Sequence, residues 1–342
     1  MITDIRDIGG YGLNLLISEF CNLKCPYCFQ KTHPYKFMKF KTFKSILDSA
    51  DENCNKNIIF FGGEPTFNKD FIDMAKYAKY NKWKIKINTN ATSTYNIHKW
   101  GKYFDSIVIS IEPTIKLTKK IRKIDKFELL MNDIKNFKIE NPNVLISFSM
   151  VMTDLVQVED VKQMVRLRKH LLNHGIYVNI LENLGDNNNW TDNLQWWFFV
   201  NEMKKQDIEM YKEYIGYDES FADGFLNPGN QYLYNLDGAY LTFDTNGNII
   251  PFDMNFDDKI GTFKDNYTDT INKIINNDYI SNCKNCMIQN KEHCSLHPGV
   301  FKNLKKETQE LLCERQRMMY MMKKELLENR EPLYGYQGIE RN

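Results

Sequence analysis

Six short apolar runs rich in β-branched residues recur through residue 181, and each is followed by a longer stretch with the helical spacing of apolar positions. Alternating strands and helices are typical of a parallel sheet. The pattern therefore predicts an α/β fold, a partial (β/α)6 barrel of parallel strands, with functional residues at the carboxyl ends of the strands. The predicted strands are Leu13–Ser18, Asn57–Phe61, Trp83–Asn88, Ser106–Ile111, Val144–Met152 and Ile176–Leu181, and the clearest helices are Lys69–Tyr80 and Val158–Asn173.

The pattern changes after residue 181. Trp196–Phe199 fall in a predicted bridging helix, where aromatic side chains usually pack in a core. Tyr240–Thr245 and Asn248–Met254 read as a β-hairpin, and a charged helix runs from about Leu304 to Asn329. We therefore expect a barrel over 1–182, a bridging helical region over 183–236, a small C-terminal β-hairpin plus helix domain over 237–329, and a loose tail over 330–342.

Composition narrows the function classes. The 342 residues include 42% hydrophobic ones, enough for a folded core, and the net charge of +1 gives no electrostatic reason to expect nucleic acid as a partner. No run approaches the roughly 20 apolar residues of a membrane span, and the N-terminus lacks the features of a signal peptide. We therefore expect no membrane partner and a cytoplasmic location, where the eight cysteines favour metal binding or redox chemistry over disulfides.

Three cysteines follow the first predicted strand with the spacing Cys21-x3-Cys25-x2-Cys28. A structural zinc site or an electron-transfer cluster usually closes with four protein ligands. Three thiolates leave one position open, which suits one iron of a [4Fe–4S] cluster that must bind a further molecule. The alternative is a zinc ion completed by a distant ligand such as His33.

The segment from Cys21 to Cys28, with an aromatic residue before the third cysteine, resembles the signature of the radical S-adenosylmethionine (SAM) enzymes. The resemblance implies that the open iron chelates SAM. It also implies that one electron from the cluster cleaves SAM to a 5′-deoxyadenosyl radical, which abstracts a hydrogen atom from the substrate. The radical chemistry belongs to the cofactor, and the protein supplies positions and charges.

Further residues fit the same resemblance. A glycine-rich turn follows the second predicted strand and is similar to the family's SAM motif, in which the small glycine lets the backbone approach the SAM methionine group. Polar residues stand after strand three and at the end of strand four, where the family places other SAM contacts. These cofactor-binding candidates are Gly62, Gly63, Glu64, Thr89, Asn90 and Ser110.

Arg122 follows Ser110 by twelve residues and fits the family's arginine for the SAM carboxylate. The sequence differs from the usual pattern here, because Ser110-Ile111-Glu112-Pro113 stands where Ser-Ile-Asp-Gly is common. The alternative is that Arg122 belongs to a solvated basic face together with neighbouring lysines.

A second group, Cys283-x2-Cys286-x7-Cys294 with Cys313 on or near the final helix, supplies four thiolates. Four thiolates can saturate a cluster, and a four-cysteine zinc site would look the same in sequence. With the hairpin before it, the group resembles the SPASM domain of radical SAM enzymes, which implies one auxiliary [4Fe–4S] cluster.

A full SPASM domain binds a further cluster, but Asp237 and Phe252 stand where the hairpin cysteines for it would fall. Asp253 occupies the place of an acidic residue that related sulfatase maturases use to deprotonate the substrate. The alternative is a solvated turn aspartate. We expect Cys54 to be a small packing residue and not a ligand, and we expect His293 and His297 to lie in a polar loop.

The resemblance favours a radical SAM oxidoreductase that modifies a peptide or protein substrate and receives electrons from a donor such as flavodoxin or ferredoxin. The first predicted strand starts by residue 13, so we expect no leader-recognition domain ahead of it. That leaves a small-molecule dehydrogenase or lyase, acting on a sugar or aminocyclitol, as the second hypothesis. A zinc-binding adaptor without catalysis is the third, and the glycine-rich turn argues against it.

Overall fold

The computed structural model describes residues 10–28, 30, 32–90, 92, 96–182, 193–215, 239–250, 259–275 and 306–328. Within these residues the strands are β1 (Tyr11–Ser18), β2 (Cys54–Gly62), β3 (Lys84–Thr89), β4 (Ser106–Ile111), β5 (Leu145–Met152), β6 (Ile176–Glu182), β7 (Ala239–Phe243), β8 (Asn248–Ile250) and β9 (Gly261–Thr262).

The described strands form one sheet in the order β6, β5, β4, β3, β2, β1, β7, β8, β9. Every neighbouring pair from β6 to β1 is parallel. The six predicted barrel strands are thereby confirmed, with ends that move by at most a few residues, as backbone hydrogen bonds rather than hydrophobic pattern fix them.

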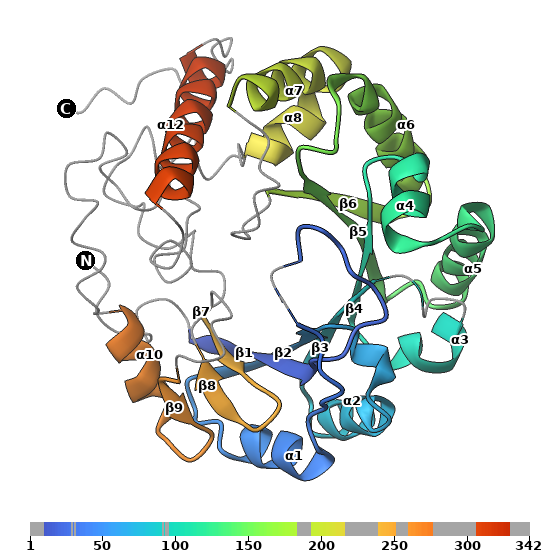
Figure 1. Cartoon of the computed structure of the whole chain (residues 1–342). Helices are drawn as coiled ribbons and strands as arrows, with labels where there is room; N and C mark the ends of the chain where they lie inside the picture. Colours follow the sequence, from blue (N-terminus) through green and yellow to red (C-terminus); the bar gives the residue numbers. More distant parts are fainter. Residues whose placement is uncertain are drawn as a thin grey trace, which may run out of the picture.

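Helices lie in an arc outside this sheet (Figure 1). Those that alternate with the barrel strands are α1 (Phe40–Asp48), α2 (Phe71–Tyr80), α3 (Ile97–Trp100), α4 (Ile115–Arg122), α5 (Phe127–Glu140) and α6 (Val161–Leu172). A parallel strand pair needs such a crossover, and the helix places its apolar face on the sheet. The predicted helix Lys69–Tyr80 begins at Phe71, and the predicted helix Val158–Asn173 begins as a 3-10 turn before α6.

The main core lies between this sheet and its helices. Alternate residues of each strand enter it, such as Leu13, Leu15 and Ile17 of β1. Successive side chains of a strand point to opposite faces, so the residues between them lie on the inner face of the sheet, away from the helices.

The predicted hairpin is confirmed over β7 and β8, whereas positions 251–254 of its predicted second strand lie outside the described residues. Its first strand joins the barrel sheet. β7 pairs in parallel with β1, and the antiparallel partner of β7 is β8. The turn between β7 and β8 is closed by Asp244, which accepts hydrogen bonds from the backbone N–H groups of Asn246 and Asn248. Gly247 has φ +84°, a conformation that favours glycine. The hairpin therefore extends the barrel sheet instead of standing apart from it.

A second core joins α6 to α7 (Asn193–Gln206), α8 (Ile208–Ile215) and α12 (Lys306–Glu328). Trp196 and Phe199 are buried in this core, as expected for the bridging helix, whereas Trp197 and Phe198 are exposed. The last described helices are α10 (Tyr267–Ile275) and α12, which confirms the predicted final helix. The proposed domain boundaries stay a prediction.

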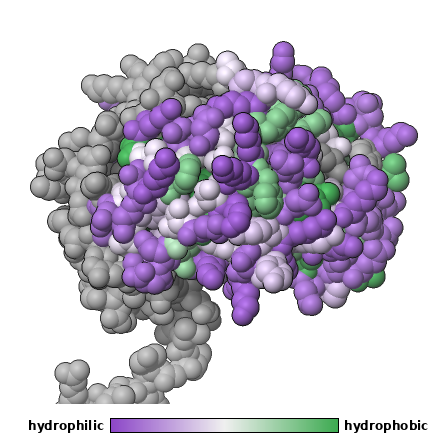
Figure 2. Space-filling view, turned by 90° about the horizontal axis from the view of Figure 1, so that it is seen from below, coloured by the Kyte–Doolittle hydropathy of each residue, from purple (hydrophilic) through white to green (hydrophobic). Residues whose placement is uncertain are grey.

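The outer surface is largely polar. Figure 2 shows the side on which α1 lies in Figure 1, and hydrophilic side chains cover most of its described part. Among the described helices, none is long and apolar enough to cross a membrane.

Candidate active site

The candidate site forms where β1, β2, β3 and β4 reach their carboxyl ends. The segment after β1 carries Cys21, Cys25 and Cys28, and the turn after β2 carries Gly62 and Gly63. Parallel strands end at one edge of a sheet, so segments far apart in sequence meet there.

The three thiols of the first group are half-buried, and none of them forms a disulfide. The backbone N–H of Cys28 donates to the carbonyl of Cys25 at 3.1 Å, which curls the end of the loop into a turn. Burial raises the pKa of Cys21 and Cys28, and raises that of Cys25 to about 11. The thiols are close enough for each to influence the ionisation of another, and a metal centre that takes them as thiolates releases their protons.

These thiols suit a multi-iron cluster better than a single ion. His33, the alternative zinc ligand, has its Nε2 3.6 Å from Sγ of Cys28. Within the described ranges, however, no three His, Cys, Asp or Glu side chains converge on a single ion position. A cluster bonds each thiolate to a different iron, so its cysteines need not meet at one point. The donor set of three half-buried thiols fits a [4Fe–4S] cluster with one open iron.

Asn90 connects the end of β3 to the cysteine loop. Its Nδ2 donates to Sγ of Cys21 at 3.4 Å and to Oδ1 of Asn22 at 2.9 Å. The backbone N–H of Leu23 also donates to the Cys21 sulfur, at 3.4 Å. Hydrogen bonds to a ligating sulfur stabilise the thiolate and tune the metal centre that it holds.

The glycine turn after β2 packs directly against the backbone that leads into the cysteine loop. Gly63 N–H donates to the carbonyl of Ser18 at 2.8 Å, and Glu64 N–H donates to the carbonyl of Phe20 at 2.7 Å. A Cβ atom at Gly63 would lie 2.2 Å from the carbonyl oxygen of Phe20, and Gly62 has φ +134°. Both positions thus require glycine for the fold itself, a reason separate from the predicted approach of SAM.

Glu64 is completely buried and is surrounded by donors of the protein. Its Oε1 accepts hydrogen bonds from the hydroxyls of Thr66 at 2.6 Å and Thr89 at 2.8 Å, and its Oε2 accepts from the backbone N–H of Asn90 at 2.7 Å. Burial raises the pKa of Glu64, and these hydrogen bonds oppose the rise. The carboxylate therefore clamps the end of β3 to the turn after β2, which positions Asn90.

Arg122 is buried at the end of α4, which rules out the solvated basic face considered above. Its Nε donates to Oε1 of Glu112 at 2.7 Å, and one terminal nitrogen donates to the hydroxyl of Tyr27 at 2.9 Å. Tyr27 also contacts Glu112 through that hydroxyl. This buried triad of Tyr27, Glu112 and Arg122 connects the cysteine loop to β4 and α4. Contact between Arg122 and a SAM carboxylate stays a prediction.

The sequence identified Arg122 as a candidate, but not its pairing with Tyr27 and Glu112, nor the role of Asn22. Glu112 was noted there as a departure from the usual Ser-Ile-Asp-Gly pattern, and the residue at the departure is the one that pairs with Arg122. The acidic residue at position 112 was therefore the one sequence signal that Arg122 has a buried partner. Ser110, the remaining predicted contact, is half-buried on the inner face of β4 beside Ser149 of β5.

The second cysteine group is described only in part. Cys313 is half-buried on α12, and α12 packs in the second core. Asp253 also belongs to the undescribed part of the chain. The remaining predicted ligands, Cys283, Cys286 and Cys294, lie outside the described residues, as do His293 and His297.

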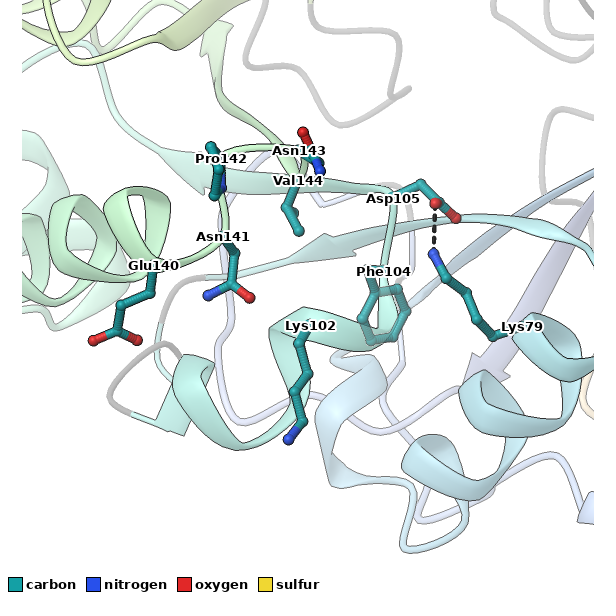
Figure 3. Close-up of a pocket in the computed structure, with 9 residues that line it drawn as sticks. All are labelled: Lys79, Lys102, Phe104, Asp105, Glu140, Asn141, Pro142, Asn143 and Val144. Carbon is teal, nitrogen blue, oxygen red and sulfur yellow. Dashed lines mark hydrogen bonds and ion pairs between the residues drawn. The ribbon is translucent and has the colours of Figure 1, made fainter.

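A polar hollow elsewhere on the barrel is unrelated to these residues. It has a volume of about 290 Å³ and lies at the amino ends of β4 and β5, where Asp105 pairs with Lys79 at 2.6 Å (Figure 3). The candidate site is at the opposite ends of the strands.

Comparison with known proteins agrees with this geometry. Residues 15–176 match the radical SAM superfamily. The chain is 32% identical over 162 residues to the cysteine-type anaerobic sulfatase-maturating enzyme of Clostridium novyi, which covers 37% of this chain and 42% of that protein. It is 26% identical over 162 residues to the S-adenosylmethionine-dependent nucleotide dehydratase of Selenomonas ruminantium, which covers 44% of this chain and 59% of that protein. The chain spans about half the length of the curated relatives that it matches.

Two solved structures share the fold. The structure of native anSMEcpe with bound AdoMet and Cp18Cys peptide superimposes with a TM-score of 0.66 at 17% identity, over 94% of this chain and 100% of that one. The structure of Streptococcus suis SuiB bound to the precursor peptide SuiA gives a TM-score of 0.57 at 17% identity, over 78% of this chain and 66% of that one. The partial barrel predicted from the strand pattern is therefore confirmed as the fold of these proteins.

Proposed function

Residues 15–176 carry a radical SAM domain, and from this premise we propose that the protein is an oxidoreductase that oxidatively modifies a side chain of a peptide or protein. The observation that carries the proposal is the loop of three half-buried thiols held by Asn90 against the ends of β2 and β3. When bound there, a [4Fe–4S] cluster and SAM supply the radical that removes a hydrogen atom from the substrate.

The chain's own residues prepare the site for that chemistry. Cys21, Cys25 and Cys28 would hold the cluster, and Glu64 fixes the strand end that bears Thr89 and Asn90. Tyr27 belongs to the second core, which also contains Leu117, Ile121 and Met152, and this apolar surrounding excludes water from one side of the loop. We assign the SAM contacts to Gly62, Gly63, Thr89, Asn90, Ser110 and Arg122. Glu64 contributes by positioning Thr89 and Asn90 through its hydrogen bonds.

Two further assignments belong to the proposal. Cys283, Cys286, Cys294 and Cys313 would hold one auxiliary [4Fe–4S] cluster, which would supply an acceptor for the electron left on a substrate radical, and Asp253 would serve as the base that removes a proton. A net two-electron oxidation needs both an electron and a proton acceptor. A small electron donor, such as a flavodoxin or a ferredoxin, would supply the electron that the SAM-binding cluster requires.

The peptide substrate is supported by the extent of the fold similarity. The structure that bears a bound Cp18Cys peptide matches 94% of this chain, which reaches beyond the barrel into the C-terminal region. The similarity shows a shared fold, and the peptide substrate is part of what we propose.

The test is anaerobic incubation of the cluster-loaded, reduced protein with SAM and with peptides encoded beside its gene. We expect 5′-deoxyadenosine and methionine, together with a peptide that has lost about two hydrogen masses or gained an oxidised group. S-adenosylhomocysteine as the sole product would overturn the radical assignment. Oxidation of a sugar or aminocyclitol with no change in any peptide would favour the small-molecule hypothesis, and zinc without iron would favour the adaptor.

A further inference from the structure

The inner face of the sheet carries a lysine in the middle of the barrel. In β3, Ile85 and Ile87 are buried in the main core beneath the helices. Lys86 and Asn88 alternate with them, so they point to the inner face. Lys86 comes three residues before Thr89, which places it about 10 Å below the strand end where the candidate site begins.

Asn14 of β1 lies at the same level of the barrel as Lys86. Asn14 is aligned with Ile59 of β2, and Ile59 is aligned with Lys86 of β3. Two strand spacings separate them, so their Cα atoms lie about 10 Å apart. Ile59 lies between them on the same face. A small group that lies over Ile59 can reach both side chains, because a lysine side chain extends well beyond half that distance. We call Lys86, Asn88 and Asn14 the inner-face polar group.

Lys86 has no counter-charge in the part of the chain that the structure describes. Its ammonium group makes no ion pair and no hydrogen bond there, although the residue is half-buried. Burial alone lowers the pKa of Lys86, and no acidic side chain in the described ranges offsets this shift. An ammonium held away from water without a partner costs free energy, which a bound anion would recover.

The two asparagines supply unused acceptors. Oδ1 of Asn14 and Oδ1 of Asn88 are buried and have no hydrogen-bond partner among the described residues. Within the described part of the chain, the one hydrogen bond of the Asn14 side chain is a long one, from Nδ2 to Oγ1 of Thr242 at 3.5 Å. Buried polar atoms of this kind nearly always have a partner, so both acceptors are available to donors of a bound molecule.

The combination defines the chemistry of the ligand. One ammonium matches the single charge of a carboxylate better than the double charge of a phosphate, since no second described cation has a place in the group. Two carbonyl acceptors match N–H or O–H donors on the same molecule. A carboxylate beside an amide N–H, as in an acidic residue of a peptide, carries both.

We propose that the inner-face polar group is the substrate subsite of this enzyme, and that it takes the carboxylate of the substrate on Lys86 and neighbouring donors of the substrate on Asn88 and Asn14. The inference rests on the proposed function, because it specifies the substrate of the same site. It adds that the substrate carries a carboxylate.

The experiment measures binding to the anaerobic, cluster-loaded protein in the presence of SAM. The probes are N-acetyl-Gly-Glu-Gly amide, its glutamine counterpart and free glutarate, titrated by calorimetry. We expect the glutamate peptide to bind about tenfold or more tightly than the glutamine peptide, because the hydrogen bond to Lys86 is charge-assisted. Protection of Lys86 from acetic anhydride, read by peptide mass spectrometry, gives a second readout that does not depend on activity.

Three variants control the result. Lys86→Met should remove the preference for the acid, and Lys86→Arg should keep it. Lys84→Met is the matched control, because Lys84 lies on the same face of β3 but is exposed at the far end of the strand, so the preference should be unchanged. Circular dichroism must show the same fold for all three.

The possible results test the subsite and the peptide substrate separately. Equal binding of the two peptides, or an unchanged preference in Lys86→Met, would overturn the subsite. Protection of Lys86 by SAM alone would overturn it too, since the group would then belong to the cofactor. Binding of glutarate but of neither peptide would keep the carboxylate subsite and count against a peptide as the substrate, which separates failure of the inference from failure of the proposed function.

Discussion

Arg122 Nε lies 2.7 Å from Glu112 Oε1, and both side chains are buried where β4 meets α4. Tyr27, two residues after Cys25 in the cysteine loop, shares its hydroxyl with both. An ion pair of this kind ties the loop that holds the metal ligands to the second core. Because both charged groups are shielded from solvent, removing one partner leaves the other buried without a counter-charge.

Glu112→Ala is therefore expected to destabilise the protein by about 3 kcal/mol or more. The measurement is the midpoint of anaerobic urea unfolding of the cluster-loaded protein. The matched control is Asp125→Ala, which breaks the exposed pair between Asp125 and Lys119 of α4, 3.3 Å apart, and should cost less than about 1 kcal/mol. Similar losses in both variants would show that the buried triad does not stabilise the fold.

Gly63→Ala is expected to lower cluster occupancy several-fold. The added Cβ would lie 2.2 Å from the carbonyl oxygen of Phe20, so the chain leading to Cys21 must move. Gly175→Ala is the control: with φ +67° it is strained by about 1 kcal/mol, but its Cβ meets only the side chain of Lys138, far from the site. Iron per chain after anaerobic reconstitution checks both, and normal iron in Gly63→Ala would contradict the packing argument.

Iron content separates the two cysteine groups. We expect about eight irons per chain in the reconstituted protein, and about four after Cys21, Cys25 and Cys28 are all replaced by Ala. Iron and sulfide assays with Mössbauer spectra give the numbers. A wild-type content of four irons would remove the auxiliary cluster from the proposal, and a triple variant without any cluster would show that the groups depend on each other.

Cys54 tests the difference between a packing cysteine and a ligand. It is half-buried against the main core, and burial raises the pKa of its thiol to about 11. Only the thiolate reacts with iodoacetamide, so at pH 8 its alkylation should be on the order of a hundredfold slower than that of an exposed cysteine with a pKa of about 8.5. The rate should rise with pH and level off only above about pH 11. Cys54→Ala should keep the full iron content.

Cys313→Ala should lose about four irons and abolish formation of the oxidised product, because the auxiliary cluster loses one of its four proposed ligands. Cluster ligation also contributes to folding, so circular dichroism must first show that α12 and the rest of the fold persist. A folded Cys313→Ala variant that still makes normal amounts of product would rule out the electron-transfer role.

Much of the fold could be predicted from the sequence because each strand repeats a simple constraint. A buried parallel strand must be apolar on the side that meets its helices, so Leu13–Ser18 and Ser106–Ile111 are recognisable from their residues alone. The pairing of β7 with β1 could not be predicted in this way. Residues 11–15 and 239–243 are separated by more than two hundred positions, and the hydrophobic pattern of a strand does not specify its neighbour.

The cysteine loop and the glycine turn were evident in sequence because their chemistry depends on residue type and spacing over a few positions. Three thiols within eight residues can reach one cluster wherever the loop lies. Tertiary structure alone decided what surrounds them. Glu64 clamps β3, Arg122 is buried against Glu112, and Lys86 faces the inner side with no counter-charge among the described residues. Those facts depend on distances between segments that the chain brings together only when it folds. Burial then determines how strongly each charge interacts with its neighbours.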